Sequence, residues 1–274
     1  MTRALPNTLS GCAVAVLTCA DGRGKAELSQ ACARKWRASR EAGAPMPLGR
    51  EQPPLRPSRP DAPELLDPRD VPKRKPGTLE GRIALLHAVA HIELNAIDLH
   101  WDVIARFADV EFPFGFYDDW VSAADDESKH FKMLSDCLES KGSFYGALPA
   151  HAGMWRAAED TTEDLMGRLA VVPMVLEARG LDVTPQMLEL FRKTKDTQAV
   201  AALEVIYEEE VAHVAYGSKW FHFLCGRHNV DPKETFHALV KRYFHGPLKP
   251  PFNAEKRAEA GLPPDFYWPL TEHA

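Results

Sequence analysis

Four long segments of the chain repeat apolar positions at intervals of three and four residues, which is the spacing of one face of an α-helix. These segments span about residues 79–108, 117–141, 155–180 and 197–227. No stretch keeps the alternation of period two that indicates a strand, and a further short helix is expected near 185–194. The pattern therefore predicts an all-α fold built on a four-helix bundle.

Capping residues mark several of the expected helix ends. Thr78 can cap the first long helix, and Asp118 or Asp119 the second, because Thr and Asp side chains accept hydrogen bonds from the free N–H groups of a first turn. Gly142 and Gly180 are expected to follow the second and third helices, since glycine readily adopts the left-handed conformation that ends helices.

Two more helices are expected before the bundle. Residues 12–20 form an apolar run that is too short to span a bilayer, and a charged segment follows at once. We interpret this run as a buried helix rather than a signal peptide. Residues 24–42 place Leu28, Cys32 and Trp36 at helical spacing and predict an amphipathic helix.

Proline-rich segments flank the bundle. Ten prolines between residues 43 and 77 exclude regular helix and sheet, which leaves either a flexible linker or an extended strap. The strap is favoured because apolar residues could anchor it: Leu55, Leu65, Leu66 and Val71. We divide the chain into an N-terminal helical segment with its strap (1–77), a four-helix bundle (78–244) and a proline-rich tail that wraps the bundle (245–274).

Composition narrows the class of protein. With 33 basic and 39 acidic residues, the net charge of −6 does not favour a nucleic-acid partner, although a tRNA substrate stays open. Five cysteines without a Cys-x-x-Cys pair argue against a disulfide framework and a zinc ribbon, and they suggest a cytoplasmic location. No run approaches the roughly 20 apolar residues that would predict a membrane span.

The candidate chemistry lies on the four long helices. The second and fourth carry Glu-x-x-His, as Glu127 with His130 and Glu210 with His213, and residues three apart share a helix face. The first and third carry Glu93 and Glu177 within apolar stripes, where a carboxylate is costly unless it is paired or binds a metal. Each pair of consecutive helices thus supplies one Glu followed by one Glu-x-x-His.

Four glutamates and two histidines in this order are typical of a site for two iron ions, and two manganese ions or a mixed pair stay open. Such ligands argue against copper or a thiolate-bound metal. The predicted metal ligands are Glu93, Glu127, His130, Glu177, Glu210 and His213. Taken singly, Glu210 could belong to a solvated acidic run and His130 could be a core histidine.

Four residues are candidates for supporting roles around this site. Asp126 and Glu209 directly precede the two Glu-x-x-His motifs and could accept a hydrogen bond from a metal-bound imidazole, or they could be exposed helix charges. His100 shares the face of Glu93, and Tyr207 lies one turn before Glu210, where a core tyrosine is the alternative.

The arrangement resembles the ferritin-like di-iron carboxylate superfamily. At closer range the chain resembles a bacterial family of ferritin-like domain proteins of unknown function, through the strings LEARGLDVTP (176–185), EEEVAHVAYGSKWF (208–221) and LKPPFN (248–253). This resemblance implies the bundle and a di-metal site on the six residues named above, and it implies no substrate. Arg179 and Asp182 of the first string are interpreted as an ion pair that fixes the end of the third helix.

The resemblance favours an enzyme that activates O₂, of the oxidase or hydroxylase type, with a small-molecule substrate and an electron donor. The alternatives are a ferroxidase or other iron-handling protein, a peroxide scavenger, a tRNA-modifying hydroxylase and a structural bundle with a degenerate site. Iron storage is disfavoured because the long extensions would obstruct a shell. A homodimer is compatible with the sequence.

Overall fold

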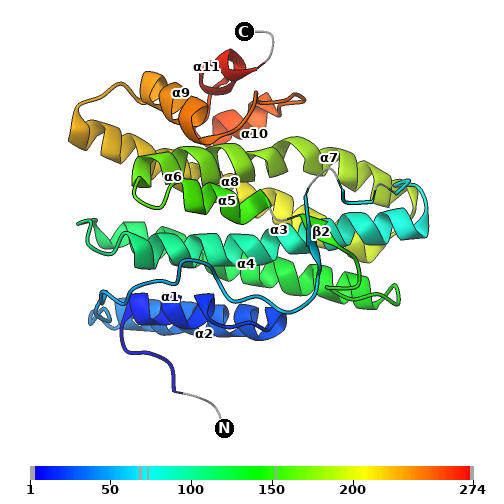
Figure 1. Cartoon of the computed structure of the whole chain (residues 1–274), viewed down its shortest axis with the longest axis horizontal. Coiled ribbons are helices and arrows are strands. Elements are labelled where there is room, and N and C mark those ends of the chain that lie inside the picture. The colour runs from blue at the N-terminus through cyan, green and yellow to red at the C-terminus, as the bar shows by residue number, and fades with distance from the viewer. Residues whose placement is uncertain (1–3, 68–69, 73, 152, 272–274) are drawn as a thin grey trace. The chain divides into compact units, whose positions relative to one another are not determined.

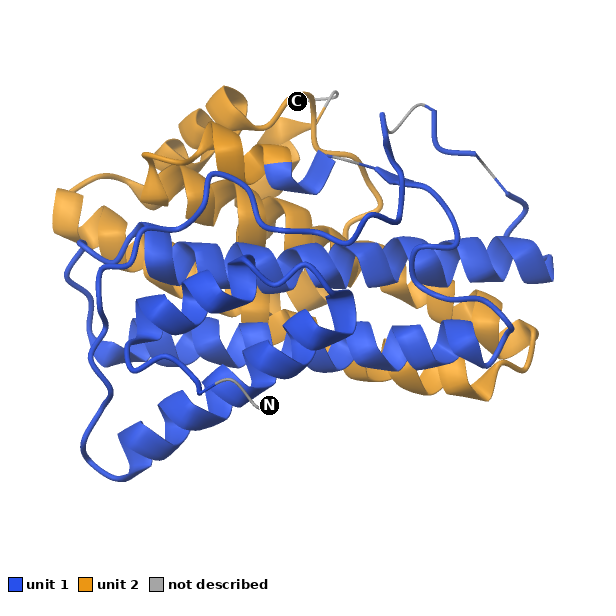
Figure 2. Cartoon of the chain, turned by 60° about the horizontal axis from the view of Figure 1, so that its bottom comes forward, with its two compact units in different colours: residues 1–155 blue, residues 156–274 orange. Residues whose placement is uncertain are grey.

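The computed structural model describes residues 4–67, 70–72, 74–151 and 153–271, and it is built almost entirely of helices, which confirms the predicted all-α class (Figure 1). No helix in this described part combines the length and the apolar character that a membrane crossing needs. The chain divides into two compact units, residues 1–155 and 156–274 (Figure 2).

The first unit is centred on a hairpin of two long helices, α3 and α4, which pack along each other. The helix α1 packs on α3, and α2 packs on α4. Two short strands pair in parallel, with Leu65 opposite Ala150. The elements are α1 (Leu9–Leu17), α2 (Gly22–Glu41), β1 (Leu65–Leu66), α3 (Leu79–Arg106), α4 (Phe114–Glu139), β2 (Ala150–His151) and α5 (Gly153–Asp160), the last of which runs across the boundary between the units.

The two predicted N-terminal helices are confirmed as α1 and α2. Cys12, Ala13 and Val16 of α1 are fully buried, as expected for a buried apolar helix. Cys32 and Trp36 of α2 are also fully buried, so the amphipathic pattern read from the sequence identifies the packed face.

The ends of α3 and α4 follow the predictions in two places out of three. Thr78 caps α3 by accepting a hydrogen bond of 3.1 Å from the N–H of Gly81. Gly142 has a φ of 70° after α4, and the N–H of Ser143 bonds back to the carbonyl of Leu138, which is a helix-terminating motif. The predicted cap at Asp118 or Asp119 is wrong, because α4 begins earlier, at Phe114, and Asp118 instead accepts a hydrogen bond from Trp36.

The proline-rich segment 43–77 forms a strap over the helices of the first unit, and its residues 68, 69 and 73 lie outside the described residues. Two of the predicted anchors are wrong, because Leu55 is 84 % exposed and Leu65 is 40 % exposed, whereas Leu66 and Val71 are half-buried. Main-chain groups hold the strap instead: the carbonyls of Pro47 and Leu48 accept from α1, and the N–H of Ser58 donates to the carbonyl of Leu17. A proline-rich chain has many carbonyls without local partners, so it docks through them.

The second unit is centred on α8, which packs against α6, η1 and α7. The segment η1 is a π-helical turn that joins α6 to α7 without a break. The elements of the second unit are α6 (Leu165–Val171), η1 (Val172–Glu177), α7 (Ala178–Lys193), α8 (Thr197–His228), α9 (Pro232–Tyr243), α10 (Ala254–Glu259), α11 (Pro264–Tyr267) and the 3₁₀ turn η2 (Trp268–Leu270).

The prediction of one helix over 155–180 and a separate one over 185–194 is wrong. The helix is interrupted before Asp164, which caps α6 by accepting from the N–H of Gly167 at 2.8 Å. It then continues past Gly180 and through Pro185 to Lys193. Proline leaves the carbonyl four residues earlier, that of Leu181, without its helical N–H. The side-chain amide of Asn253 donates to this carbonyl at 3.2 Å, so the tail completes the helix.

The C-terminal tail packs within the second unit. Tyr267 is fully buried and Phe266 is 6 % exposed, whereas Trp268 is 49 % exposed. Two short helices, α10 and α11, alternate with the prolines of this segment. Apolar and aromatic side chains therefore fix most of the tail, as the sequence predicts.

Candidate metal centre

Three of the predicted ligands meet inside the α3–α4 hairpin of the first unit. Glu93 on α3 is 3 % exposed, and Glu127 and His130 on α4 are fully buried. The Nδ1 atom of His130 lies 3.2 Å from Oε2 of Glu93 and 3.4 Å from Oε2 of Glu127. One ligand atom from each of these three residues lies within 4.8 Å of the others, a spacing that a shared metal ion could bridge.

Local sequence explains why these groups converge. Glu93 follows Leu86 and Ala90 on the buried face of α3, and Glu127 precedes Phe131 and Leu134 on the buried face of α4. The helical repeat therefore carries each carboxylate to the same side as the apolar residues.

The electrostatics of the cluster favour a cation. Burial raises the pKa of Glu93 well above its usual range, and the nearby carboxylate of Glu127 raises it further. Two carboxylates that are both removed from water can stay ionised only if positive charge compensates them. The residues present thus fit a hard, positively charged ligand such as a divalent metal ion.

His100, another predicted supporting residue, lies beside this cluster on α3. It is 1 % exposed, and its Nε2 atom lies 3.6 Å from Oε1 of Glu127. Its ring stacks on Trp120 with centroids 5.5 Å apart, which fixes the orientation of the imidazole. The imidazole of His100 therefore borders the Glu127 carboxylate without a hydrogen bond between Nε2 and Oε1.

The second unit carries the other three predicted ligands. Glu177 is the last residue of η1 and is 8 % exposed, while Glu210 and His213 on α8 are 6 % and 0 % exposed. The Nδ1 atom of His213 lies 3.8 Å from Oε2 of Glu210. A π-helical turn shifts the residues after it around the helix axis, and such turns are frequent at functional sites.

Two glycines shape the surroundings of Glu210. A Cβ atom at Gly217 would lie 2.4 Å from Pro173, so glycine permits the close approach of η1 to α8. Gly180 lies beside Glu210, where a Cβ atom would be 3.8 Å from its Cγ. Both glycines belong to the strings that prompted the family resemblance.

The other predicted supporting residues are Asp126, Glu209 and Tyr207. Asp126 is partly exposed and pairs with Lys129 at 3.0 Å on the same helix. Glu209 is partly exposed on α8. The hydroxyl of Tyr207 accepts a hydrogen bond of 2.6 Å from Asn253 of the tail, which directs it towards the tail.

The histidine pair in the N-terminal half of α3, His87 and His91, has structural partners. His87 accepts a hydrogen bond from the N–H of Gly146 at 2.9 Å. His91 contacts the hydroxyl of Tyr145 at 2.9 Å and the carbonyl of His151 at 3.1 Å. Burial lowers the pKa of His87 to about 4 and that of His91 to about 3, so both imidazoles are neutral near pH 7. These histidines tie α3 to the connection that follows α4.

The predicted ion pair of Arg179 and Asp182 is confirmed at 3.4 Å, but sequence reasoning missed the other partners of Asp182. Its carboxylate binds Arg257 through two hydrogen bonds of 2.8 and 2.7 Å and accepts a third from the N–H of Asn253. The neighbouring Arg179 donates to the carbonyls of Lys249 and Pro251. Two of the strings that marked the family, 176–185 and 248–253, are thus in contact. The recurrence of polar residues in both strings was the available signal for this contact.

Comparisons with known proteins identify a family for the chain. The chain is 42 % identical over 208 residues to an "Uncharacterized protein" of Haemophilus influenzae, an alignment that covers 74 % of this chain and 72 % of that one. No solved structure matches the chain. Residues 18–268 match the model of the family described as "Protein of unknown function (DUF455)", and the chain therefore belongs to that family.

Proposed function

We propose that the chain binds two iron ions through Glu93, Glu127, His130, Glu177, Glu210 and His213, and that it is an O₂-activating oxidase or oxygenase. The observation that carries the proposal is the buried cluster of Glu93, Glu127 and His130, whose ligand atoms lie within 4.8 Å of one another. The second unit repeats the same three residue types in the same order on η1 and α8. Two such sets together match the ligand requirement of a carboxylate-bridged pair of metal ions.

Iron is the preferred metal in this proposal because the set combines carboxylates with two imidazoles and contains no thiolate. Manganese, or one ion of each kind, would satisfy the same ligands. A reduced di-iron pair, when bound, supplies the O₂ chemistry that amino-acid side chains cannot perform. Its substrates would be O₂ and a small molecule, and its electrons would come from a separate donor.

The protein's own residues have two tasks in this proposal. Burial of all six side chains excludes water from the site and keeps the carboxylates oriented. His100 and the ring of Trp120 behind it limit the movement of the Glu127 carboxylate. The ligand set would thus be largely preformed before a metal arrives.

Metal analysis tests the proposal. Protein purified after growth with added iron or manganese is expected to contain about two metal ions per chain, held by nitrogen and oxygen ligands in X-ray absorption spectra. Glu127→Ala should lower this content strongly, because it removes a carboxylate from the cluster of the first unit. Glu80→Ala, which removes an exposed carboxylate from the first turn of α3, is the matched control and should retain the metal. Equal metal content in both variants, or none in the wild type, would contradict the proposal.

A further inference from the structure

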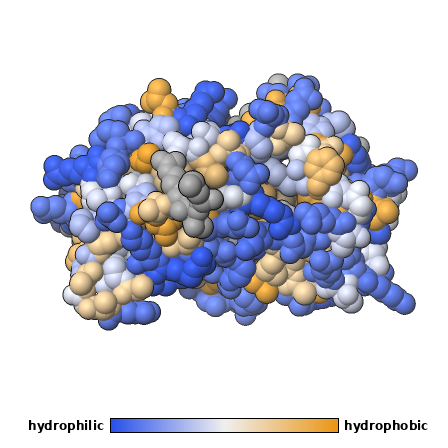
Figure 3. All heavy atoms as spheres, turned by 90° about the horizontal axis from the view of Figure 1, so that it is seen from below, coloured by the Kyte–Doolittle hydropathy of each residue, from blue (hydrophilic) through white to orange (hydrophobic). Residues whose placement is uncertain are grey.

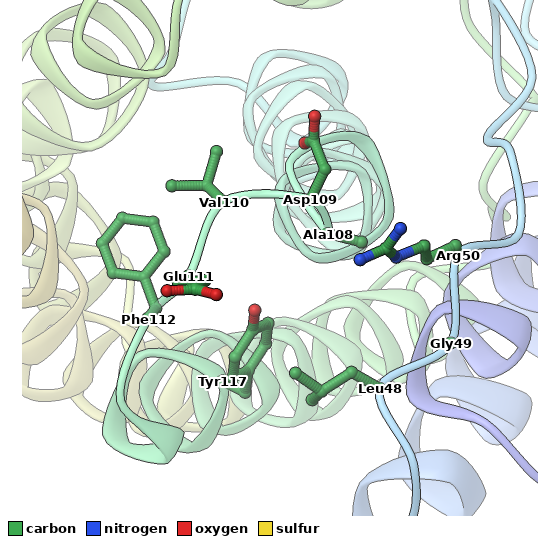
Figure 4. Close-up of a pocket in the computed structure, with 9 residues that line it drawn as sticks. All are labelled: Leu48, Gly49, Arg50, Ala108, Asp109, Val110, Glu111, Phe112 and Tyr117. Atoms are coloured by element: carbon green, nitrogen blue, oxygen red, sulfur yellow. The ribbon is translucent and has the colours of Figure 1, made fainter.

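A cavity of 630 Å³ lies at one end of the α3–α4 hairpin in the first unit (Figure 4). Its charged lining side chains, Arg50, Asp109 and Glu111, are exposed, and water and salt screen charges of this kind. They therefore hold a ligand or a neighbouring helix only weakly. The second unit contains a polar contact of the opposite kind, which is largely buried and joins the C-terminal tail to α7 and α8.

Asn253 of the tail links both helices. Its side-chain amide donates to the carbonyl of Leu181 on α7 at 3.2 Å and to the hydroxyl of Tyr207 on α8 at 2.6 Å. Its side-chain oxygen accepts from the N–H of Lys256 at 3.2 Å, and its own N–H donates to Asp182 at 2.9 Å. The side-chain amide thus has partners on its nitrogen and on its oxygen, which fixes its orientation.

Arg257 forms a second link between the tail and α7. Its side chain is 2 % exposed, and its Nε and Nη2 atoms donate to the two carboxylate oxygens of Asp182 at 2.8 and 2.7 Å. The Nη2 atom also donates to the carbonyl of Ala178 at 3.4 Å. The guanidinium packs over the rings of Phe252 and Tyr267, 5.0 and 4.7 Å from their centroids. A buried two-point contact of this geometry allows the joined elements little movement.

Both links lie within about one helical turn of two predicted ligands. Ala178 directly follows Glu177, and Leu181 lies one turn beyond it. Tyr207 precedes Glu210 by one turn on α8, on the same side of that helix. The tail therefore joins α7 to α8 where each helix is close to a candidate ligand.

The segment from η1 to α7 has two features that weaken a helix. The turn η1 is π-helical, which is a rare form, and it ends at Glu177 itself. Pro185 lies inside α7 and removes the main-chain N–H that would bond to the carbonyl of Leu181. The amide of Asn253 takes the place of this N–H. The helix that follows Glu177 thus depends on the tail for part of its hydrogen bonding.

We propose that Asn253 and Arg257 are positioning residues for the part of the metal site that the second unit supplies. Asn253 fixes α7 against α8, and Arg257 fixes the first turn of α7. Together they present Glu177 and Glu210 to the same metal ion. Neither residue touches the metal, because α7 already engages the amide and the guanidinium. The inference rests on the proposed function, since Glu177 and Glu210 are ligands only in that proposal.

Titration of the full-length, metal-free protein with Co²⁺ tests this role. Co²⁺ takes the same nitrogen and oxygen ligands as Fe²⁺, and its visible absorption reports the geometry of those ligands. The wild type is expected to bind about two ions per chain. Asn253→Ala and Arg257→Ala should each weaken the binding of one ion about tenfold or more and change its absorption bands, because a group that orients the ligands is lost.

Two exposed positions of the same unit provide matched controls. Asn229→Ala removes an exposed amide at the C-terminal end of α8. Arg192→Ala removes an exposed ion pair between α7 and α8, in which Arg192 lies 2.6 Å from Glu204. Both variants should bind Co²⁺ with the affinity and the absorption of the wild type, because exposed contacts of this kind contribute little.

Two further measurements separate positioning from unfolding. Tyr207→Phe removes only the hydroxyl that Asn253 binds and should weaken one ion about threefold. Added to Asn253→Ala it should have no further effect, because both changes break the same hydrogen bond. Hydrogen exchange of the Asn253→Ala and Arg257→Ala proteins should rise in residues 176–182 and 207–213 and stay unchanged in α9.

The outcomes distinguish this role from the proposed function. Two bound ions with wild-type affinity and absorption in Asn253→Ala, Arg257→Ala and Tyr207→Phe would overturn only the positioning role. An equal rise of hydrogen exchange in α9 would show a general loss of stability and would also overturn it. A wild type that binds no Co²⁺ would contradict the proposed function and the positioning role together.

Discussion

Lys25 and Asp98 form an ion pair that is almost completely removed from water, since each side chain is 1 % exposed and their Nζ and Oδ1 atoms are 2.5 Å apart. Lys25 also donates to the carbonyl of Ser58, which joins α2, α3 and the strap at one point. Burial raises the pKa of Asp98 to about 6, and the charge of Lys25 only partly opposes this increase. A single buried pair therefore couples the packing of the first unit to pH.

The raised pKa of Asp98 predicts the sign of a pH effect on stability. An aspartate in the unfolded chain titrates near pH 4, so between about pH 4 and 6 the folded state binds more protons than the unfolded state. The stabilisation linked to Asp98 is present below about pH 4 and is lost as pH rises through about 6. Relative to Asp98→Asn, the free energy of unfolding of the wild type should fall by up to about 3 kcal/mol over this range.

Urea unfolding of both proteins at pH 4 and pH 7 measures this difference. Asp61→Asn, at an exposed position on the strap, is the matched control and should follow the wild type at both pH values. If the difference between wild type and Asp98→Asn does not change with pH, the carboxyl group of Asp98 titrates as it does in the unfolded chain.

Sequence reasoning could not find this pair. A lysine on an amphipathic helix is expected at the exposed edge, and Lys25 gives no sign in the sequence that its partner lies on α3. Glu93 and Glu127 were predictable, by contrast, because each interrupts an apolar stripe of its own helix. A local pattern can show that a charge is buried among apolar neighbours, but it cannot name a distant partner.

At the scale of helices, the segment from α6 to α7 also shows that a local sequence pattern does not determine the whole structure of an element. Apolar spacing predicts a helix in this region, but it does not distinguish a π-helical turn from an α-helical one, so the register after Pro173 was not predictable. The sequence predicts a new helix near Pro185, whereas α7 continues through this residue because Asn253 of the tail satisfies the carbonyl that the proline leaves free. The break before Asp164 had a recognisable signal, because Thr161, Thr162 and Asp164 are capping residues.

The contact of Asp182 with the tail carries a prediction at this scale. Arg257 is 2 % exposed and packs its guanidinium over the rings of Phe252 and Tyr267, with Asp182 as its partner in the ion pair. Asp182→Ala leaves a buried positive charge and is expected to lower the free energy of unfolding by about 3–5 kcal/mol. The tail around residues 248–257 should then become sensitive to protease under native conditions.

An exposed pair between α8 and the tail provides the control. Lys256 binds Glu208 at 3.2 Å, but the carboxylate of Glu208 is 68 % exposed. Glu208→Ala should therefore cost no more than about 1 kcal/mol and should leave the tail resistant. Similar losses in the two variants would show that the Asp182–Arg257 contact does not fix the tail.

At the scale of the whole chain, spacing and composition were enough to predict three features. These are the all-α class, the two sets of one Glu followed by one Glu-x-x-His, and the ordered proline-rich ends. The division into two units was not, because it falls at residue 155, within α5, where no linker composition marks it. On the face shown in Figure 3, hydrophilic surface predominates and the apolar areas are small and separate. Within each unit, the chain's own elements cover the central helices. In the first unit, α1 and α2 pack on α3 and α4. In the second unit, α6, α9 and α10 pack on α8, and α9 also packs on α6.

This coverage bears on whether the proposed iron site serves oxidation chemistry or storage. A storage protein tiles its subunits through broad faces of its helices, and a shell needs large, well-packed interfaces. Here α1, α2 and the strap occupy that kind of face in the first unit, and α9, α10 and the tail do so in the second.

We therefore expect ferrous protein to consume O₂ in proportion to its sites and to form no mineral core. Oxygen uptake per chain against added ferrous iron, together with particle mass, measures this outcome. Glu210→Ala should abolish the uptake and Glu80→Ala should not, because only Glu210 belongs to the proposed ligand set. Uptake that continues for hundreds of irons per chain, in a particle of shell size, would decide for storage.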